Sequence, residues 1–239
     1  MNKLYLTIDL LTISAPLLLS FDKRVAFYKQ WKYLFPAMLL MGVVFIAKDV
    51  IFAASGIWGF NDRYLVGFRM LGLPIEEWLF FVAVPYAIVF IYACLLVYVK
   101  KDILKSVHRP FLMALSVILI VVGVLYYDRL YTSVIFILTA LLLLYNVYKK
   151  QAWLGYFLLA YLVSLIPFLI VNGLLTGYFT EEPIVWYDNS QNLGVRILSI
   201  PIEDSIYSLM MMLMTIQGME WLRRNGKRNS NKTELASER

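Results

Sequence analysis

The sequence predicts an all-α membrane protein with about seven transmembrane helices, and three observations support this fold class. The 239-residue chain is 61% hydrophobic and 16% charged, with a mean hydropathy of +0.71, unlike an ordinary soluble domain. Apolar runs fill most of its length, and a backbone in lipid must pair its polar groups internally, so these runs are expected to be helices. The third observation is a repeated phrase that divides the helices into two units.

Seven apolar runs approach the roughly 20 residues that cross a hydrocarbon core of ~30 Å. They cover about residues 2–20, 34–56, 75–99, 110–127, 129–148, 152–177 and 201–222. The first run carries Asp9 and Pro16 and lacks a convincing cleavage site, so we interpret it as a helix rather than a signal peptide. Residues 223–239 are polar and are expected to form a disordered cytoplasmic tail.

Basic residues alternate between the two ends of the predicted helices. Sixteen of the 22 lie in the tail or in the connections after the first, third and fifth runs. Five lie at the other ends of the helices, and Lys48 lies within a run. The positive-inside rule therefore predicts an external N-terminus and a cytoplasmic C-terminus in the cell membrane. This asymmetry accounts for the net charge of +6 without a nucleic-acid partner.

An eleven-residue phrase occurs twice, 127 residues apart. GFRMLGLPIEE covers residues 67–77, and GVRILSIPIED covers residues 194–204. Four predicted helices separate the copies, so both are expected on the non-cytoplasmic side, in parallel repeats. We therefore predict one membrane domain over residues 1–222, followed by the tail. Its parts are repeat one, a linker helix and repeat two, over residues 1–99, 110–127 and 129–222.

Each phrase ends in two carboxylates at the predicted start of a helix. Pro74 and Pro201 suit the first helical turn, where a missing N–H is tolerated. A purely structural interpretation is that the acids complement the helix dipole, by roughly 0.3–1 kcal/mol, while Arg69 and Arg196 neutralise them. That interpretation does not explain why a chain with few charges contains the same arginine–acid phrase twice. Acids at the mouth of a membrane helix are costly, which favours a function.

The functional interpretation is a pair of buried proton donors. Removal from water favours the protonated form of a carboxyl group, and a neutral carboxyl group can act as a general acid. Consecutive helix positions point about 100° apart, so one carboxyl of each pair can face a given pocket. Glu76 and Glu203 are identical between the copies, and we predict them as the acids. Glu77 and Asp204 are then predicted to orient them.

Several familiar chemistries lack the residues that they need. The chain has one histidine, His108, so a cluster of histidine ligands for iron is missing and no metal is predicted. No glycine-rich dinucleotide motif follows a strand pattern, so no cofactor is expected. The last helix has no lysine for a retinal Schiff base. Lys48, beside Asp49, is interpreted as an interfacial or paired charge.

Aromatic residues gather near both phrases. They could form an interfacial belt and core, or line an apolar groove whose ring faces stabilise a carbocation. The predicted substrate-binding residues are Trp78, Phe80, Phe81, Trp186 and Tyr207, together with Asn172.

These residues resemble the membrane-integral, flavin-independent lycopene cyclases, whose hallmark is a duplicated P-x-E-E/D motif. The motif reads PIEE at residues 74–77 and PIED at residues 201–204. The stretches 168–177 and 183–187 also resemble the second unit of that family. The resemblance covers nearly the whole chain apart from the tail, and it implies a fusion of the two small subunits found in bacteria.

The resemblance implies a cofactor-independent isomerase that closes β-rings on lycopene from the bilayer. In such a reaction a neutral Glu protonates C2 of the acyclic ψ-end, the C5=C6 double bond attacks the resulting C1 cation, and a base removes a proton from C6. One ring gives γ-carotene and two give β-carotene. The number of rings closed, the ring type, the base, the oligomeric state and contacts with other carotenoid enzymes stay open. Of one composite site and two separate sites, we favour one pocket between the third and seventh helices.

The alternative function is a small-solute transporter, because small sugar transporters also have two parallel three-helix repeats and a linker helix. Pro74 and Pro201 would then mark hinges. Against this alternative, the phrase lies at a helix mouth, and the spans offer few polar groups to bind a sugar. A scaffold subunit of a pigment pathway is a third interpretation.

Overall fold

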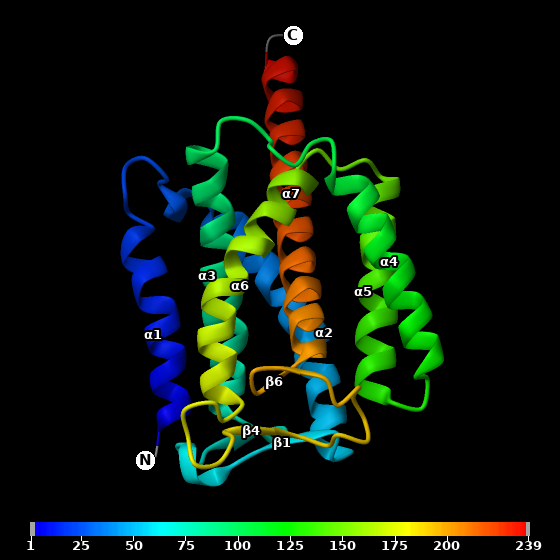
Figure 1. Cartoon of the computed structure of the whole chain (residues 1–239). Coiled ribbons are helices and arrows are strands. Elements are labelled where there is room, and N and C mark those ends of the chain that lie inside the picture. The colour runs from blue at the N-terminus through cyan, green and yellow to red at the C-terminus, as the bar shows by residue number, and fades with distance from the viewer. Residues whose placement is uncertain (1–2, 238–239) are drawn as a thin grey trace.

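Within the described residues, 3–237, the chain folds into a bundle of seven α-helices (Figure 1). The structure is a computed structural model, and it describes side-chain surroundings up to residue 226. The helices are α1 (Leu4–Leu19), α2 (Trp31–Ala54), α3 (Ile75–Tyr98), α4 (His108–Leu125), α5 (Leu130–Tyr148), α6 (Leu154–Leu175) and α7 (Ile202–Ser237). The first six agree with the predicted runs to within three residues, so the predicted all-α fold class is confirmed.

Among the described residues, five helical segments are long and apolar enough to cross a membrane. They are Phe27–Ala54, Ile75–Tyr98, His108–Leu125, Leu130–Tyr148 and Leu154–Leu175. Helix α1 is apolar but has 16 residues, fewer than the roughly 20 of a full span. Helix α7 has 36 residues and continues to Ser237, although the composition of its last part favours a disordered tail. The chain is therefore a helical membrane protein.

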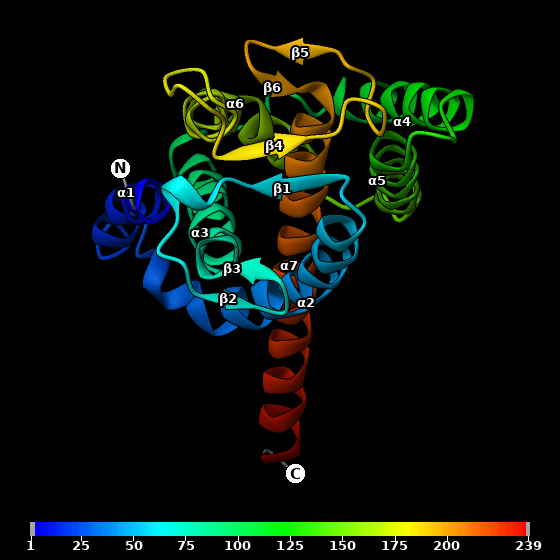
Figure 2. The same ribbon diagram turned by 90° about the horizontal axis from the view of Figure 1, so that it is seen from below.

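Short strands join the helices at the end of the bundle where α3 and α7 begin (Figure 2). Strand β1 (Trp58–Phe60) pairs antiparallel with β4 (Val185–Tyr187), which connects the two repeats. Each phrase forms a hairpin before its helix, with β2 (Arg69–Met70) on β3 (Leu73–Pro74) and β5 (Arg196–Ile197) on β6 (Ile200–Pro201). The 3-10 helices are η1 (Phe27–Gln30) and η2 (Asp62–Tyr64).

The two hairpins share an unusual backbone conformation. Leu71 and Leu198 have φ angles of 53° and 58°, in the left-handed region where side chains other than those of Gly, Asn and Asp are uncommon. In the first hairpin Gly72 follows with φ 82°, which glycine adopts without strain. Ser199 occupies the corresponding place in the second hairpin. The repeats therefore match in backbone detail as well as in sequence.

The two repeats interlock. Within each repeat the first helix packs on the third, α1 on α3 and α5 on α7. Between repeats the middle helix of one packs on the third helix of the other, α2 on α7 and α6 on α3. Helix α4 packs mainly on α5 at the periphery (Figure 2). This is the predicted pair of parallel three-helix repeats joined by a linker helix.

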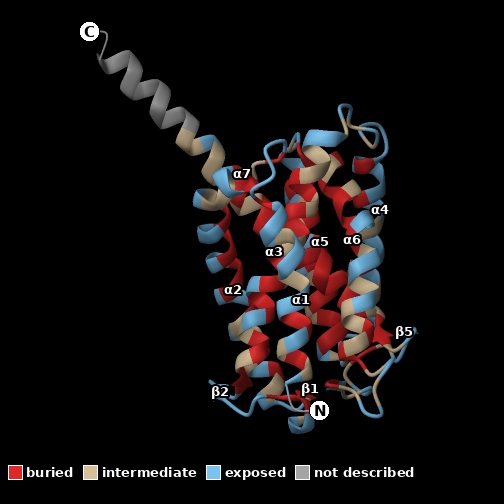
Figure 3. Ribbon diagram, turned by 90° about the vertical axis from the view of Figure 1, so that its left-hand side faces the viewer, coloured by how far each residue is buried: buried red, intermediate tan, exposed pale blue. Residues whose placement is uncertain are grey.

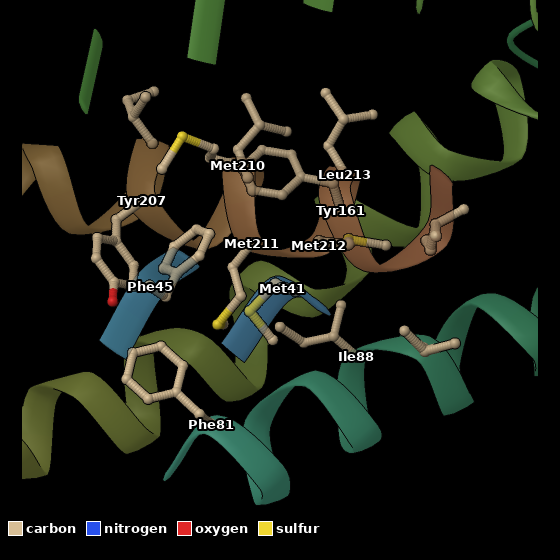
Figure 4. Packing of buried hydrophobic residues seen from close by; sticks show 14 of the residues in the cluster. Met41, Phe45, Phe81, Ile88, Tyr161, Tyr207, Met210, Met211, Met212 and Leu213 are labelled. Atoms are coloured by element: carbon tan, nitrogen blue, oxygen red, sulfur yellow. The ribbon is translucent and has the colours of Figure 1, made fainter. Parts of the chain in front are cut away.

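Helix α7 lies at the centre of the bundle. Its residues Met210 to Leu213 are all buried, and Figure 4 shows them among side chains of α2, α3 and α6. A helix that is apolar and buried on every side is surrounded by other helices.

Figure 3 shows the opposite pattern on the outer faces of the bundle, where exposed residues predominate on α4. Exposed apolar side chains such as Leu18 and Val117 are suited to contact with lipid.

We expect Gly218→Leu to destabilise the contact between α2 and α7. A Cβ atom on Gly218 would lie 3.1 Å from the Cβ of Ala37, so a larger side chain forces the helices apart. Overpacking of this kind costs about 1–3 kcal/mol. Gly42→Leu on α2 is the matched control, because a Cβ there meets nothing within 4 Å. Thermal unfolding of the detergent-solubilised protein should show a lower midpoint for Gly218→Leu alone, and equal midpoints would contradict this packing.

Candidate active site between the two repeats

Each phrase places its acidic residues in the first turn of a helix. Pro74 and Pro201 end strands β3 and β6, one residue before α3 and α7 begin. The prolines were expected within the first turn, but Pro74, with φ −65° and ψ 152°, is the extended residue that precedes the helix. The hairpin therefore fixes where the helix starts, and with it the directions of the two carboxyl groups that follow.

The first carboxyl group of each phrase binds the loop that precedes its hairpin. Glu76 Oε1 accepts a hydrogen bond from the Val66 amide at 2.6 Å. Glu203 Oε1 accepts from the Leu193 amide at 2.7 Å and from the Thr132 hydroxyl at 2.6 Å. Both residues are fully buried, and the Oε2 atom of each has no hydrogen-bond partner among the described residues. These two groups therefore hold the loops in place.

The second carboxyl group of each phrase points into the bundle and accepts a hydrogen bond from the first helix of its own repeat. Tyr5 donates to Glu77 Oε2 at 2.6 Å, and Tyr131 donates to Asp204 Oδ1 at 2.5 Å. The two tyrosines begin the first helices of the two repeats, so the contacts correspond. Asp204 has an additional donor, since Tyr187 of β4 donates to its Oδ2 at 2.9 Å. Both carboxyl groups are buried.

Glu77 and Asp204 line one shared cavity of about 50 Å³, which we call the reaction cavity. Its walls come from both repeats and from the β1–β4 pair. They include Tyr5, Trp58, Phe60, Phe80, Tyr131, Asn172, Thr176, Tyr187 and Tyr207. The Asn172 side chain donates to Asp204 Oδ2 at 3.4 Å, a long and therefore weak contact. The cavity is smaller than an isoprenoid end group, so such a group requires movement of wall side chains.

Tyr187 belongs to strand β4, which covers the reaction cavity. Burial, together with the adjacent carboxyl of Asp204, raises the pKa of Tyr187 well above its usual range. Tyr187 therefore stays protonated at neutral pH and acts as a hydrogen-bond donor to Asp204.

Lys48 lies behind one wall of the reaction cavity. Its Nζ is 3.0 Å from Asp49 Oδ1, and the two side chains are 13% and 1% exposed. It also lies 3.7 Å from the ring centre of Tyr207 and 5.0 Å from that of Trp58. Tyr207 in turn donates to Asp49 Oδ2 at 3.0 Å. Of the two alternatives expected for Lys48, an interfacial or a paired charge, the structure shows the paired one, and the pair is buried in the bundle.

The aromatic residues predicted from the sequence divide into three groups. Phe80 and Tyr207 line the reaction cavity, as does Asn172. Trp78 and Phe81 line a different cavity between α2 and α3. Trp186 is 42% exposed and packs over Gly59, because it faces away from the cavity that its neighbour Tyr187 lines.

The arginines of the phrases support the hairpins. Arg69 donates to the Gly72 carbonyl at 3.1 Å, and Arg196 donates to the Ser199 carbonyl at 2.7 Å. Arg69 also forms an ion pair with Asp62 at 2.6 Å. Both guanidinium groups thus bind turn atoms outside the carboxyl cluster, and the structural interpretation in which they neutralise the acids does not fit.

Two features of the site were missed in the sequence. Tyr5 and Tyr131 occupy matching places at the starts of α1 and α5, and the repeat itself was the signal that could have identified them. Asp9, one turn after Tyr5, is 2% exposed, and its carboxylate oxygens have no hydrogen-bond partner among the described residues. Its signal was a charge inside an apolar run. Within the described part of the chain, no group of three or more His, Cys, Asp or Glu residues is arranged to hold a metal ion.

We expect Glu76→Leu to destabilise the protein more than Glu76→Gln. Leucine leaves the Val66 amide without its acceptor, whereas glutamine retains an oxygen for it. A typical hydrogen bond contributes about 0.5–1.5 kcal/mol, and this one is part-buried. Thermal unfolding in detergent checks the difference, and two variants of equal stability would remove the loop-holding role of Glu76.

The comparisons with known proteins bear on this site. A family model described as lycopene cyclase matches residues 2–95 and 128–222. The two matched segments coincide with the two repeats and leave out the linker helix α4 and the end of α7. No curated protein and no solved structure gives a significant match.

Proposed function

The chain belongs to the lycopene cyclase family, and from this membership we propose that it closes β-rings on lycopene by proton-initiated cyclisation. The observation that carries the mechanism is that Glu77 and Asp204, one from each repeat, line the same aromatic-walled cavity. Cyclisation is an isomerisation, so one proton is added at C2, one proton is removed from C6, and no proton is consumed overall. Two carboxyl groups in one cavity are sufficient for that exchange without a redox partner.

Glu77 is the proposed proton donor. It is buried in the bundle and accepts a hydrogen bond from Tyr5. Burial favours a neutral carboxyl group, which can protonate C2 of the ψ-end. Protonation leaves a tertiary cation at C1, and attack by the C5=C6 double bond closes the ring.

Asp204 is the proposed base. Asp204 is buried as well, but it accepts hydrogen bonds from Tyr131, Tyr187 and Asn172. These donors favour its ionised form, which can remove the proton from C6. A pair of carboxyl groups in unlike environments is the usual basis for separate acid and base roles. Because both groups line the reaction cavity, the proton can return from Asp204 to Glu77 and restore the starting state.

The aromatic walls stabilise the intermediate cation. Ring faces attract a cation by about 2 kcal/mol or more when the site is desolvated, and Phe80, Trp58 and Tyr207 line the cavity. The charge of Lys48 opposes a carbocation nearby, but Asp49 at 3.0 Å offsets that charge. The buried pair thus fixes the Tyr207 ring without leaving an unbalanced charge at the wall.

These roles differ from those predicted for the phrase. Glu76 and Glu203 were expected to be the acids because they are identical between the repeats. Both bind loop amides, while the carboxyl groups that follow them line the cavity. We therefore propose that Glu76 and Glu203 position the site and that Glu77 and Asp204 act on the substrate.

We expect Glu77→Gln and Asp204→Asn each to lower ring formation by at least ~10²-fold, because loss of a general acid or base has this effect. Each variant is expressed in lycopene-producing cells, and the pigments are separated by chromatography with protein amounts determined by immunoblot. The control is Glu181→Gln, an exposed carboxylate at the same end of the bundle.

Glu76→Gln separates the two assignments. It should retain most ring formation, because an oxygen remains available to the Val66 amide. Full activity of Glu77→Gln combined with an inactive Glu76→Gln would return the acid role to Glu76. If cells that express the wild-type protein contain only unchanged lycopene, the cyclase proposal is rejected as a whole.

The reaction cavity is proposed to lie near the non-cytoplasmic surface of a cell membrane. The phrases share one end of the bundle with the N-terminal end of α1 (Figure 1). Most basic residues belong to the connections at the other end or to the tail.

Cysteine labelling tests this orientation in a Cys94→Ala background. A membrane-impermeant maleimide should label Glu181→Cys in intact cells, and it should label Lys101→Cys only after permeabilisation. The reverse pattern would invert the orientation.

A further inference from the structure

A second cavity, of about 300 Å³, lies between α1, α3, α6 and α7. We call it the α1/α6 groove, and its walls include Leu11, Val84, Ile88, Ile91, Pro167 and Phe168. Leu11 is 68% exposed on the outer face of α1, so the groove reaches the surface that faces lipid. Its volume is at the lower end of the range of small-molecule sites.

The groove presents almost no polar groups to an occupant. Two of its hydroxyl residues, Thr12 and Ser164, donate to carbonyls of their own helices at 2.8 Å. Pro16 and Pro167 also line it, and each lies inside its helix, where proline removes a backbone hydrogen bond and bends the helix. The walls therefore suit a hydrocarbon, and the helix bends that shape them are built into the sequence.

Asn172 connects the groove to the reaction cavity. It lines both cavities, and its side chain reaches Asp204 through the 3.4 Å contact described above. A contact of that length is easily broken, so the boundary between the two spaces can open with little loss of stabilisation. The cavity between α2 and α3 is larger, about 700 Å³, but it shares no lining residue with the reaction cavity.

We propose that the α1/α6 groove binds the polyene chain of the carotenoid while its acyclic end passes Asn172 into the reaction cavity. This inference rests on the proposed cyclase function. A conjugated polyene is long, apolar and stiff, so it loses little conformational entropy when it is held in a fixed groove. A saturated lipid chain loses more, because each of its single bonds rotates. The groove thus favours a polyene over the lipid chains that surround it.

Ala87→Phe tests the groove because Ala87 lies on its wall. The added ring fills space that the polyene needs, as overpacking does in a core. Ala47→Phe is the matched control, since Ala47 lines the cavity between α2 and α3. Lycopene is achiral, so its induced circular dichroism on the purified protein reports binding without turnover. We expect about tenfold weaker binding or more for Ala87→Phe, and wild-type binding for Ala47→Phe.

Ala87→Val checks that any loss comes from filling the groove rather than from misfolding, because it should weaken binding less than Ala87→Phe at an unchanged thermal midpoint. Wild-type binding by Ala87→Phe, or a loss confined to Ala47→Phe, would overturn the inference. Labelling with a photoreactive phospholipid gives a second test. If the phospholipid labels the groove equally with and without excess lycopene, the inference is also overturned. A wild-type protein that binds lycopene through the groove but forms no ring would reject the cyclase function and leave the groove in place.

Discussion

Two carboxyl groups that follow one another on a helix cannot face the same way, and the site depends on this constraint. The helix turns by about 100° per residue, so one member of each pair faces the preceding loop and the other faces the cavity inside the bundle. Glu76 and Glu203 bind loop amides, and Glu77 and Asp204 line the reaction cavity. The phrase therefore combines, in adjacent residues, a loop anchor and a carboxyl group that lines the cavity.

The two copies of the phrase provide matching positions with different surroundings. Tyr5 and Tyr131 make equivalent hydrogen bonds to Glu77 and Asp204. The second carboxyl group receives a further bond from Tyr187 of the covering strand. Duplication thus explains the shared backbone, and divergence in the covering segments gives the two related carboxyl groups different hydrogen-bond partners.

Most of the fold could be predicted from the sequence, because apolar runs and the repeated phrase are local signals. The parallel repeats follow from the even number of helices between the copies. The direction of each carboxyl group could not be predicted, since it depends on partners such as Tyr5 and Tyr131 that lie more than 70 residues away in the chain. Trp186 was assigned to the site because it lies near the phrase, but strand alternation places its neighbour at the cavity.

The interlocked repeats enclose one reaction cavity between them, although the phrase occurs twice. On the proposed function, a symmetrical substrate with two identical termini cannot have both processed at once. After the first cyclisation the monocyclic product has to leave the cavity, reverse its direction in the bilayer and bind again with its other terminus. The monocyclic product is then a diffusible species that competes with fresh substrate, so the ratio of monocyclic to bicyclic pigment depends on substrate supply.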